Sequence, residues 1–228
     1  MNLGLMALLL LPPFLLSLYA QYKVKSSFSE MSRVPTNLSG AQAARRMLDS
    51  SGLQSVGIER VAGHLSDHYD PRAKVLRLSQ EVHDGRSMAS LGVACHEAGH
   101  AFQDAHRYAP LVIRNLAVPA ANFGSSISGI LLMLGIVMSL KPLLWFGILL
   151  FSLVVFFQLV NLPVEFDASA RAKKQLVALG MISDHDSQYV GKVLNAAALT
   201  YVAATLQSVM TLLYYVMHAL SGSRSNSS

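Results

Sequence analysis

The residues best suited to chemistry in this chain are five consecutive ones, His96-Glu97-Ala98-Gly99-His100. Histidines four residues apart project from one face of an α-helix, so both imidazoles can reach a metal ion that lies about 2 Å from each nitrogen. Glu97 lies beside them and can take a proton from an activated water without being a ligand itself. The HExxH spacing therefore predicts one catalytic Zn²⁺, with His96 and His100 as ligands and Glu97 as the general base.

A catalytic zinc usually has three protein ligands, so the chain must supply a third one. His106 stands where metzincins, with the pattern HExxHxxGxxH, place their third histidine. Gln103 replaces the glycine that turns the chain there, however, and in a continuing helix His106 would point about 240° away from His100. We therefore favour Glu165, the only glutamate after the motif, because an apolar hairpin would return it to the active helix.

The elements that must position these residues include long apolar segments. Hydrophobic residues make up 52% of the chain and charged residues only 14%, a composition typical of membrane proteins. Since about 20 apolar residues cross a bilayer, we predict spans over residues 2–20, 124–140, 143–162 and 195–220, the middle two separated at Lys141-Pro142. The first is expected to be an uncleaved anchor, because no basic residue precedes it as in a signal peptide.

The polar sequence at residues 21–123 predicts a catalytic segment of mixed secondary structure. It comprises a helix over 39–49, a strand over 56–61, a β-hairpin over 66–79 with its turn at Asp70-Pro71-Arg72, and the active helix from Ser87 to His106. Pro163 is expected to begin a new helix in the second polar segment, residues 163–194. The serine-rich tail at 221–228 is expected to be disordered. The expected fold is mainly α with a small β-hairpin or sheet, a zincin-like protease held by about four transmembrane helices.

Basic residues are distributed unevenly along the chain. Twelve of the 18 Lys and Arg residues lie in residues 21–123 and four in 163–194, which predicts that both segments are cytoplasmic. The net charge of +5 is then explained by topology and anionic lipid, and no nucleic-acid partner is required. The single cysteine, Cys95, excludes an internal disulfide; we interpret it as a packing residue, with a role near the metal left open.

Three motifs together carry a family resemblance over most of the chain. The HExxH motif, the upstream Asp67-His-Tyr-Asp-Pro71 and the downstream Asn161-Leu-Pro-Val-Glu165 resemble the neutral zinc metallopeptidases of the YugP type. More distantly, the order of HExxH, two spans and a glutamate is similar to the HtpX-type and CAAX prenyl proteases. The resemblance implies a membrane-embedded gluzincin in which Glu165 is the third zinc ligand.

One position departs from the pattern of the distant relatives. Those proteins orient a metal histidine with an aspartate four residues after the glutamate ligand, and here Ser169 occupies that place. Asp167 lies two residues after the glutamate and is expected to point elsewhere. We therefore expect either residue to reach a metal histidine only through local distortion or a water molecule.

These features predict a membrane-bound, zinc-dependent endopeptidase in the cell membrane, acting on peptide or membrane-protein substrates. The developing oxyanion needs a further donor, and the candidates are His68, Tyr69, His185 and Tyr189, with His68 favoured because its hairpin could line a substrate cleft. The alternative is a zinc-binding, non-proteolytic scaffold or adaptor, which would not need the base Glu97. A transporter is disfavoured, because the first three spans carry no ionisable group apart from Lys141 at the break. The sequence specifies neither the substrate nor the oligomeric state.

Overall fold

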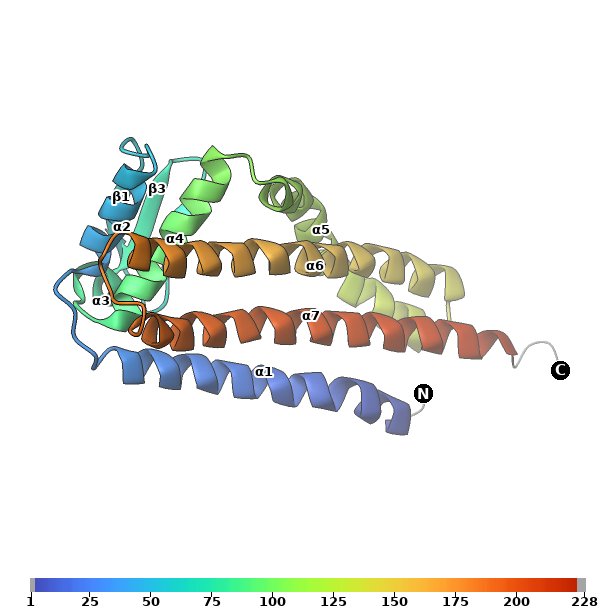
Figure 1. Ribbon diagram of the computed structural model, residues 1–228. Helices are drawn as coiled ribbons and strands as arrows, with labels where there is room; N and C mark the ends of the chain where they lie inside the picture. The colour runs from blue at the N-terminus through green and yellow to red at the C-terminus, as the bar shows by residue number, and fades with distance from the viewer. Residues whose placement is uncertain (1–2, 225–228) are drawn as a thin grey trace. The chain divides into compact units, whose positions relative to one another are not determined.

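Helices dominate the computed structural model, which describes residues 3–224 (Figure 1). In chain order the elements are α1 (Leu3–Met31), α2 (Gly40–Ser50), β1 (Gly57–Val61), β2 (His68–Asp70), β3 (Val75–Ser79), α3 (Gln80–Asp84), α4 (Met88–Ala105), α5 (Ala109–Val137), α6 (Lys141–Ala178) and α7 (Ser187–Arg224). They fall into an apolar unit, made of Met1–Tyr19, Ile113–Leu162 and Thr200–Ser228, and a polar unit, made of Ala20–Val112 and Pro163–Leu199. The prediction of a mainly α protein with a small sheet is confirmed.

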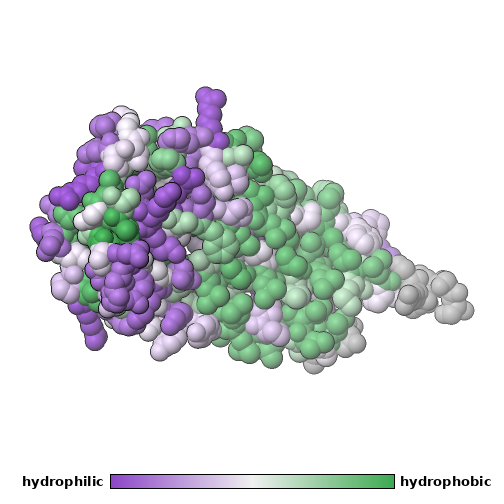
Figure 2. All heavy atoms as spheres, in the orientation of Figure 1, coloured by the Kyte–Doolittle hydropathy of each residue, from purple (hydrophilic) through white to green (hydrophobic). Residues whose placement is uncertain are grey.

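Long apolar helices supply the apolar unit. In the described part of the chain, four helices are long and apolar enough to cross a membrane: Gly4–Met31, Ala109–Val137, Lys141–Ala178 and Ser187–Ser221. Large apolar side chains such as Leu116, Val137 and Leu149 are exposed, and hydrophobic residues cover these helices on the face drawn in Figure 2. Four apolar helices were expected; each extends beyond the predicted span at one end or both, although α5 ends at Val137, three residues before the predicted end at 140.

Two element boundaries differ from the prediction. Pro163 begins no new helix, because α6 runs without interruption from Lys141 to Ala178. Proline removes a single N–H donor, and a long helix with intact turns on both sides can accommodate that loss. Helix α7 likewise reaches Arg224, so residues 221–224 of the expected disordered tail are helical, while 225–228 lie outside the described residues. Extending an existing helix needs no new nucleation, so a serine-rich composition alone does not end it.

The polar unit is built around α4. Helix α2 begins with a capping box in which Ser39 and Gln42 satisfy each other's backbone N–H groups, and its apolar face packs on α4. The core of this unit combines residues of α1, α2, α3, α4, the sheet, the end of α6 and the start of α7, among them Met31, Met47, Leu76, Leu91, Leu176 and Val190. These contacts hold α4 on several sides, so its side chains have fixed surroundings.

A three-stranded sheet with the order β1-β3-β2 completes the polar unit. Strands β2 and β3 form the predicted antiparallel hairpin, and Asp70 closes its turn by accepting the N–H groups of Arg72 and Ala73 at 2.9 and 3.1 Å. Strand β1 pairs in parallel with β3, which the sequence analysis did not anticipate. This order leaves β2 as an edge strand, and α4 contacts it.

Candidate metal centre

Side chains from α4 and α6 converge on one point within the polar unit. His96 Nε2 and His100 Nε2 lie 3.2 and 3.7 Å from Glu165 Oε2. One ligand atom of each residue lies within 4.8 Å of the other two, and this is the one such group of His, Cys, Asp or Glu found among residues 3–224. The histidine side chains are 12% exposed and that of Glu165 is 5% exposed. The structure thus brings together the three ligands expected from the sequence.

The close approach of α4 and α6 depends on a glycine inside the motif. A Cβ atom at Gly99 would lie only 2.9 Å from the backbone oxygen of Ala168 and 3.2 Å from its Cα. Since Ala168 lies between Glu165 and Ser169 in the sequence, this contact places both of those side chains against the histidines. Any larger residue at position 99 would force the two helices apart.

Each histidine has a partner on its second ring nitrogen. His96 Nδ1 lies 3.1 Å from Ser169 Oγ, and His100 Nδ1 lies 3.0 Å from Gln103 Oε1. The rings stand edge to face, with centroids 4.7 Å apart. The expectation that Ser169 needs distortion or a water molecule to reach a histidine was wrong, because the Gly99 contact brings the helices close enough for direct contact.

The electrostatics of the three residues fit a bound cation. Glu165 Oε2 is buried and accepts no hydrogen bond with acceptable geometry, although two ring nitrogens lie near it. Burial disfavours the charged form of His100, but the nearby Glu165 carboxylate and the charge of Glu97 outweigh burial and raise the pKa of His100 above its ordinary value. Each of the three side chains directs one ligand atom toward the other two. Two imidazoles and one carboxylate are the donor set of His₂Glu zinc sites.

Glu97 lies beside this group and is held by the hairpin. Its carboxylate is buried, with the residue 8% exposed, and Oε2 accepts the backbone N–H of Tyr69 at 3.0 Å. Neighbouring Asp67 is anchored by the N–H of Ser79 at 2.7 Å, and its pKa is raised mainly by burial, with a contribution from the charge of Glu97. The edge strand β2 therefore supplies a fixed donor to the predicted base.

The candidates for the oxyanion donor have different hydrogen-bond partners and exposures in the structure. The Tyr69 hydroxyl donates to Asp104 Oδ2 at 2.7 Å, and Lys74 Nζ donates to the same oxygen at 2.5 Å. Burial and this carboxylate raise the pKa of Tyr69, so its one proton is committed to Asp104. His68 is exposed, with Nδ1 2.8 Å from the backbone oxygen of Ser66. The His185 side chain is 75% exposed and lies 6.2 Å from the Tyr189 ring, apart from the metal group.

His106 and Cys95, which the sequence analysis left as alternatives near the metal, lie outside the metal group. His106 is the C-cap residue of α4. Its Nδ1 lies 2.9 Å from the Phe102 backbone oxygen, and its ring stacks on the Phe102 ring with the centroids 3.9 Å apart. A carbonyl oxygen can only accept, so His106 Nδ1 is the donor. Cys95 is fully buried, and burial raises the pKa of its thiol to about 12. The structure leaves both outside the metal group.

Gln103 is the site residue that sequence reasoning missed. Its side chain is fully buried, and its Nε2 donates to the Val164 backbone oxygen and to Asp167 Oδ2, both at 2.8 Å. The sequence analysis considered Gln103 only as an interruption of the metzincin pattern. A polar residue three positions after a ligand histidine, on the same helix face, was the signal that could have indicated it.

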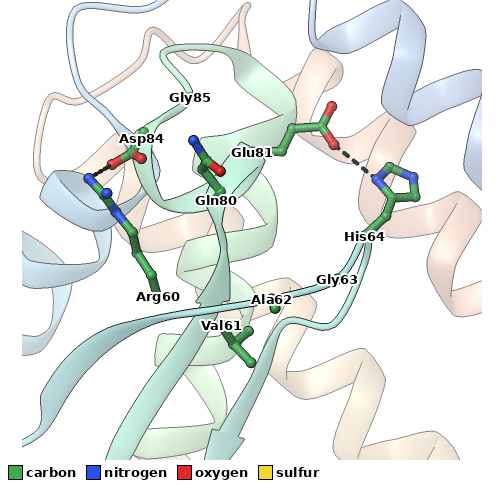
Figure 3. Close-up of a pocket in the computed structure, with 9 residues that line it drawn as sticks. All are labelled: Arg60, Val61, Ala62, Gly63, His64, Gln80, Glu81, Asp84 and Gly85. Carbon is green, nitrogen blue, oxygen red and sulfur yellow. Dashed lines mark hydrogen bonds and ion pairs between the residues drawn. The ribbon is translucent and has the colours of Figure 1, made fainter.

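A separate pocket lies between β1 and α3 (Figure 3). This β1–α3 pocket has a volume of about 930 Å³ and is lined by Arg60, Val61, Ala62, Gly63, His64, Gln80, Glu81, Asp84 and Gly85. Its charged groups neutralise one another, with Arg60 Nη2 2.7 Å from Asp84 Oδ1 and His64 Nδ1 2.9 Å from Glu81 Oε2. It contains none of the three metal-site residues.

Comparison with known proteins agrees with the chemistry of the metal group. The profile of a family described as "Putative neutral zinc metallopeptidase" matches residues 6–220, and the chain belongs to this family. A relative from Bacillus subtilis (strain 168), described as "Putative membrane protease YugP", is 48% identical over 213 residues, which cover 92% of this chain and 95% of the relative. No solved structure matches the chain. The metal group and Glu97 lie inside the matched range.

Proposed function

We propose that this protein is a membrane-bound zinc endopeptidase of the gluzincin class, with one zinc ion held by His96, His100 and Glu165. The observation that carries the proposal is the convergence of these three ligand atoms, within 4.8 Å of one another, beside the buried carboxylate of Glu97. Membership of a zinc metallopeptidase family and similarity to a membrane protease support it. A scaffold that only binds zinc would not need a buried carboxylate at position 97.

The residues around the ligands suggest how a peptide bond is hydrolysed. Zinc bound in this group would polarise the scissile carbonyl and lower the pKa of a water molecule. Glu97 Oε2 accepts the N–H of Tyr69, which holds the carboxylate in place. The other carboxylate oxygen, Oε1, takes the water proton and passes it to the leaving amine.

His68 is the proposed donor to the oxyanion, and its hydrogen bond defines how it would act. Its Nδ1 faces the backbone oxygen of Ser66, which can only accept, so Nδ1 carries a proton. His68 can then donate from Nε2 only as the imidazolium cation. We expect His68→Ala to lower kcat more than it changes KM; an unchanged kcat would remove His68 from the mechanism.

The decisive experiment compares the protein with its Glu97→Gln variant in detergent. Both should contain one zinc per chain, whereas only the unaltered protein should cleave casein, because the substitution removes the base and leaves the ligands. Equal cleavage by the variant would exclude this mechanism. Zinc without any cleavage in either protein would favour the scaffold. If the variant is inactive but zinc-bound, crosslinking it in cells should capture the physiological peptide or membrane-protein substrate.

We further propose a multi-pass protein of the cell membrane with the polar unit on the cytoplasmic side. The proposal is supported by the concentration of Lys and Arg in residues 21–123 and 163–194. In a Cys95→Ser background, a cysteine placed at Ser139 should react with an impermeant reagent added outside, and cysteines at Ser50 or Ser183 should not. Labelling at Ser50 would reverse the orientation and make the substrates extracytoplasmic.

A further inference from the structure

We propose that Gln103 is a positioning residue that holds His100 in the tautomer whose Nε2 lone pair faces the metal. The inference rests on the proposed zinc function, because it concerns how one ligand of that site is prepared. Gln103 is fully buried on α4, three residues after His100, and its Oε1 lies 3.0 Å from His100 Nδ1. Its other hydrogen-bond partners are the Val164 backbone oxygen and Asp167, which are not metal-group residues, so its effect on the metal would pass through His100.

The orientation of the Gln103 amide is forced by its surroundings. Its Nε2 lies 2.8 Å from the Val164 backbone oxygen and 2.8 Å from Asp167 Oδ2, and both of these atoms can only accept hydrogen bonds. A flipped amide would place its oxygen against two other acceptors inside a buried site, where that oxygen would have no donor. The amide oxygen therefore faces His100.

The protonation of His100 follows from that orientation. An amide oxygen accepts and cannot donate, so the atom facing it, His100 Nδ1, must carry a proton. A metal ligand must be a neutral imidazole, which has one N–H; with that proton at Nδ1, the Nε2 lone pair is left for an ion on the side where Glu165 Oε2 lies 3.7 Å away. His96 differs, because its partner is the Ser169 hydroxyl, which can donate or accept and does not by itself select a tautomer.

Two further contacts keep the amide in place. Asp167 Oδ2 also accepts a hydrogen bond from Arg171 Nε at 2.5 Å, so the guanidinium holds this carboxylate in place. The Arg171 guanidinium in turn lies 4.5 Å from the centre of the Phe102 ring, next to Gln103 in the sequence. Both acceptors of the amide, Val164 and Asp167, flank Glu165 on α6, so one side chain couples the α6 ligand to an α4 ligand.

The first test measures zinc affinity by competition with a chelator. Gln103→Met keeps the length of the side chain and removes the amide, and we expect it to weaken zinc binding about 10- to 100-fold. Asp167→Leu should weaken binding less, since Val164 still orients the amide. Asp167→Asn should change it by less than about threefold, because its oxygen can replace Oδ2 for both donors. Asp104→Asn is the matched control, a polar change one residue further along α4 that contacts Tyr69 and Lys74, and it should leave zinc affinity unchanged.

The second test detects the tautomer without metal or activity. In metal-free protein labelled with ¹⁵N-histidine, studied at an alkaline pH where His100 is neutral, His100 should give the signals of a single Nδ1–H tautomer, assigned by comparison with His100→Ala. Gln103→Met should give a mixture of tautomers, whereas Asp104→Asn should not.

A single unchanged tautomer in Gln103→Met, or zinc affinity equal to that of the unaltered protein, would overturn the inference. If Gln103→Met fails to fold, equal zinc affinity in Asp167→Leu and Asp167→Asn would overturn it. Failure of the proposed function is distinguishable, because the unaltered protein would then bind no zinc, or bind zinc without cleaving casein, while the tautomer signals remain.

Discussion

The metal group and the β1–α3 pocket both combine histidines with carboxylates, but they differ in how those groups face one another. In the metal group, His96, His100 and Glu165 are at most 12% exposed and direct their ligand atoms to one point. In the β1–α3 pocket, the side chains of His64 and Glu81 are 60% and 49% exposed and pair with each other. Arg60 and Asp84 form a second, separate pair there.

This difference distinguishes a metal-binding site from a surface that carries paired charges. In the pocket each acid has its own partner, His64 for Glu81 and Arg60 for Asp84, and these exposed pairs contribute little to stability. In the metal group one carboxylate serves two ring nitrogens, and Glu165 Oε2 is buried without a satisfying donor. A buried acceptor in that state needs a cation. A cavity alone does not reveal this, since the charged side chains that line the β1–α3 pocket are paired with one another.

Removal of the Glu165 carboxylate, which lies near both histidines, should have the largest effect on zinc binding. Glu165→Ala should lower bound zinc from one ion per chain to a small fraction and abolish peptidase activity, because two histidines alone leave the ion short of one ligand. Glu81→Ala, the matched change in the β1–α3 pocket, should retain both zinc and activity. Metal analysis of the two purified variants checks this. Equal zinc loss in both would mean that the comparison between the two regions is wrong.

Widening the contact between α4 and α6 should have an intermediate effect. Gly99→Ala would place a Cβ atom 2.9 Å from the Ala168 oxygen, so the helices must separate, at a cost of about 1–3 kcal/mol in the free energy of unfolding. We expect a lower melting temperature in detergent and weaker zinc binding. Gly129→Ala is the control, because a Cβ atom there meets no atom within 4 Å and alanine favours the helix. If both variants bind zinc equally well, the close approach is not required.

The partly exposed ion pair between Asp70 and Arg77 in the hairpin should have a smaller effect, on stability, and this effect should depend on pH. Hydrogen bonds from Arg77 and from the N–H groups of Ala73 and Arg72 lower the pKa of Asp70 from 3.8 to about 2. A folded-state pKa below the unfolded value adds stability above the unfolded pKa, and this is lost as the pH falls through the folded value. Asp70→Asn, which keeps the turn acceptor, should therefore lower the melting temperature slightly at neutral pH. The difference should shrink between about pH 4 and pH 2, and a constant difference would contradict this account.

Loss of the helix-capping histidine should have the smallest effect on the metal. His106→Ala should retain full zinc content, because His106 hydrogen-bonds the Phe102 backbone and stacks on the Phe102 ring away from the ligands. A small decrease in melting temperature is the only change expected. Zinc loss in His106→Ala together with zinc retention in Glu165→Ala would replace the gluzincin arrangement with a metzincin-like one.

The sequence by itself determined the features that depend on local geometry. The spacing of His96 and His100 puts both rings on one helix face, whatever surrounds the helix. Ser39 and Gln42 mark a helix start, Asp70 marks a turn, and apolar segments of about 20 residues mark helices able to cross a membrane. The choice of Glu165 over His106 also came from the sequence, through helix rotation and the order of the segments.

Only the tertiary structure decided which distant groups meet. Ser169 contacts a histidine 73 positions earlier, Asp167 contacts Gln103 across 64 positions, and the Tyr69 N–H reaches Glu97 across 28. The parallel pairing of β1 with β3 and the passage of α6 through Pro163 were likewise not predicted. Such contacts depend on how closely two helices pack, here at Gly99 and Ala168, and no local spacing or residue preference specifies that distance.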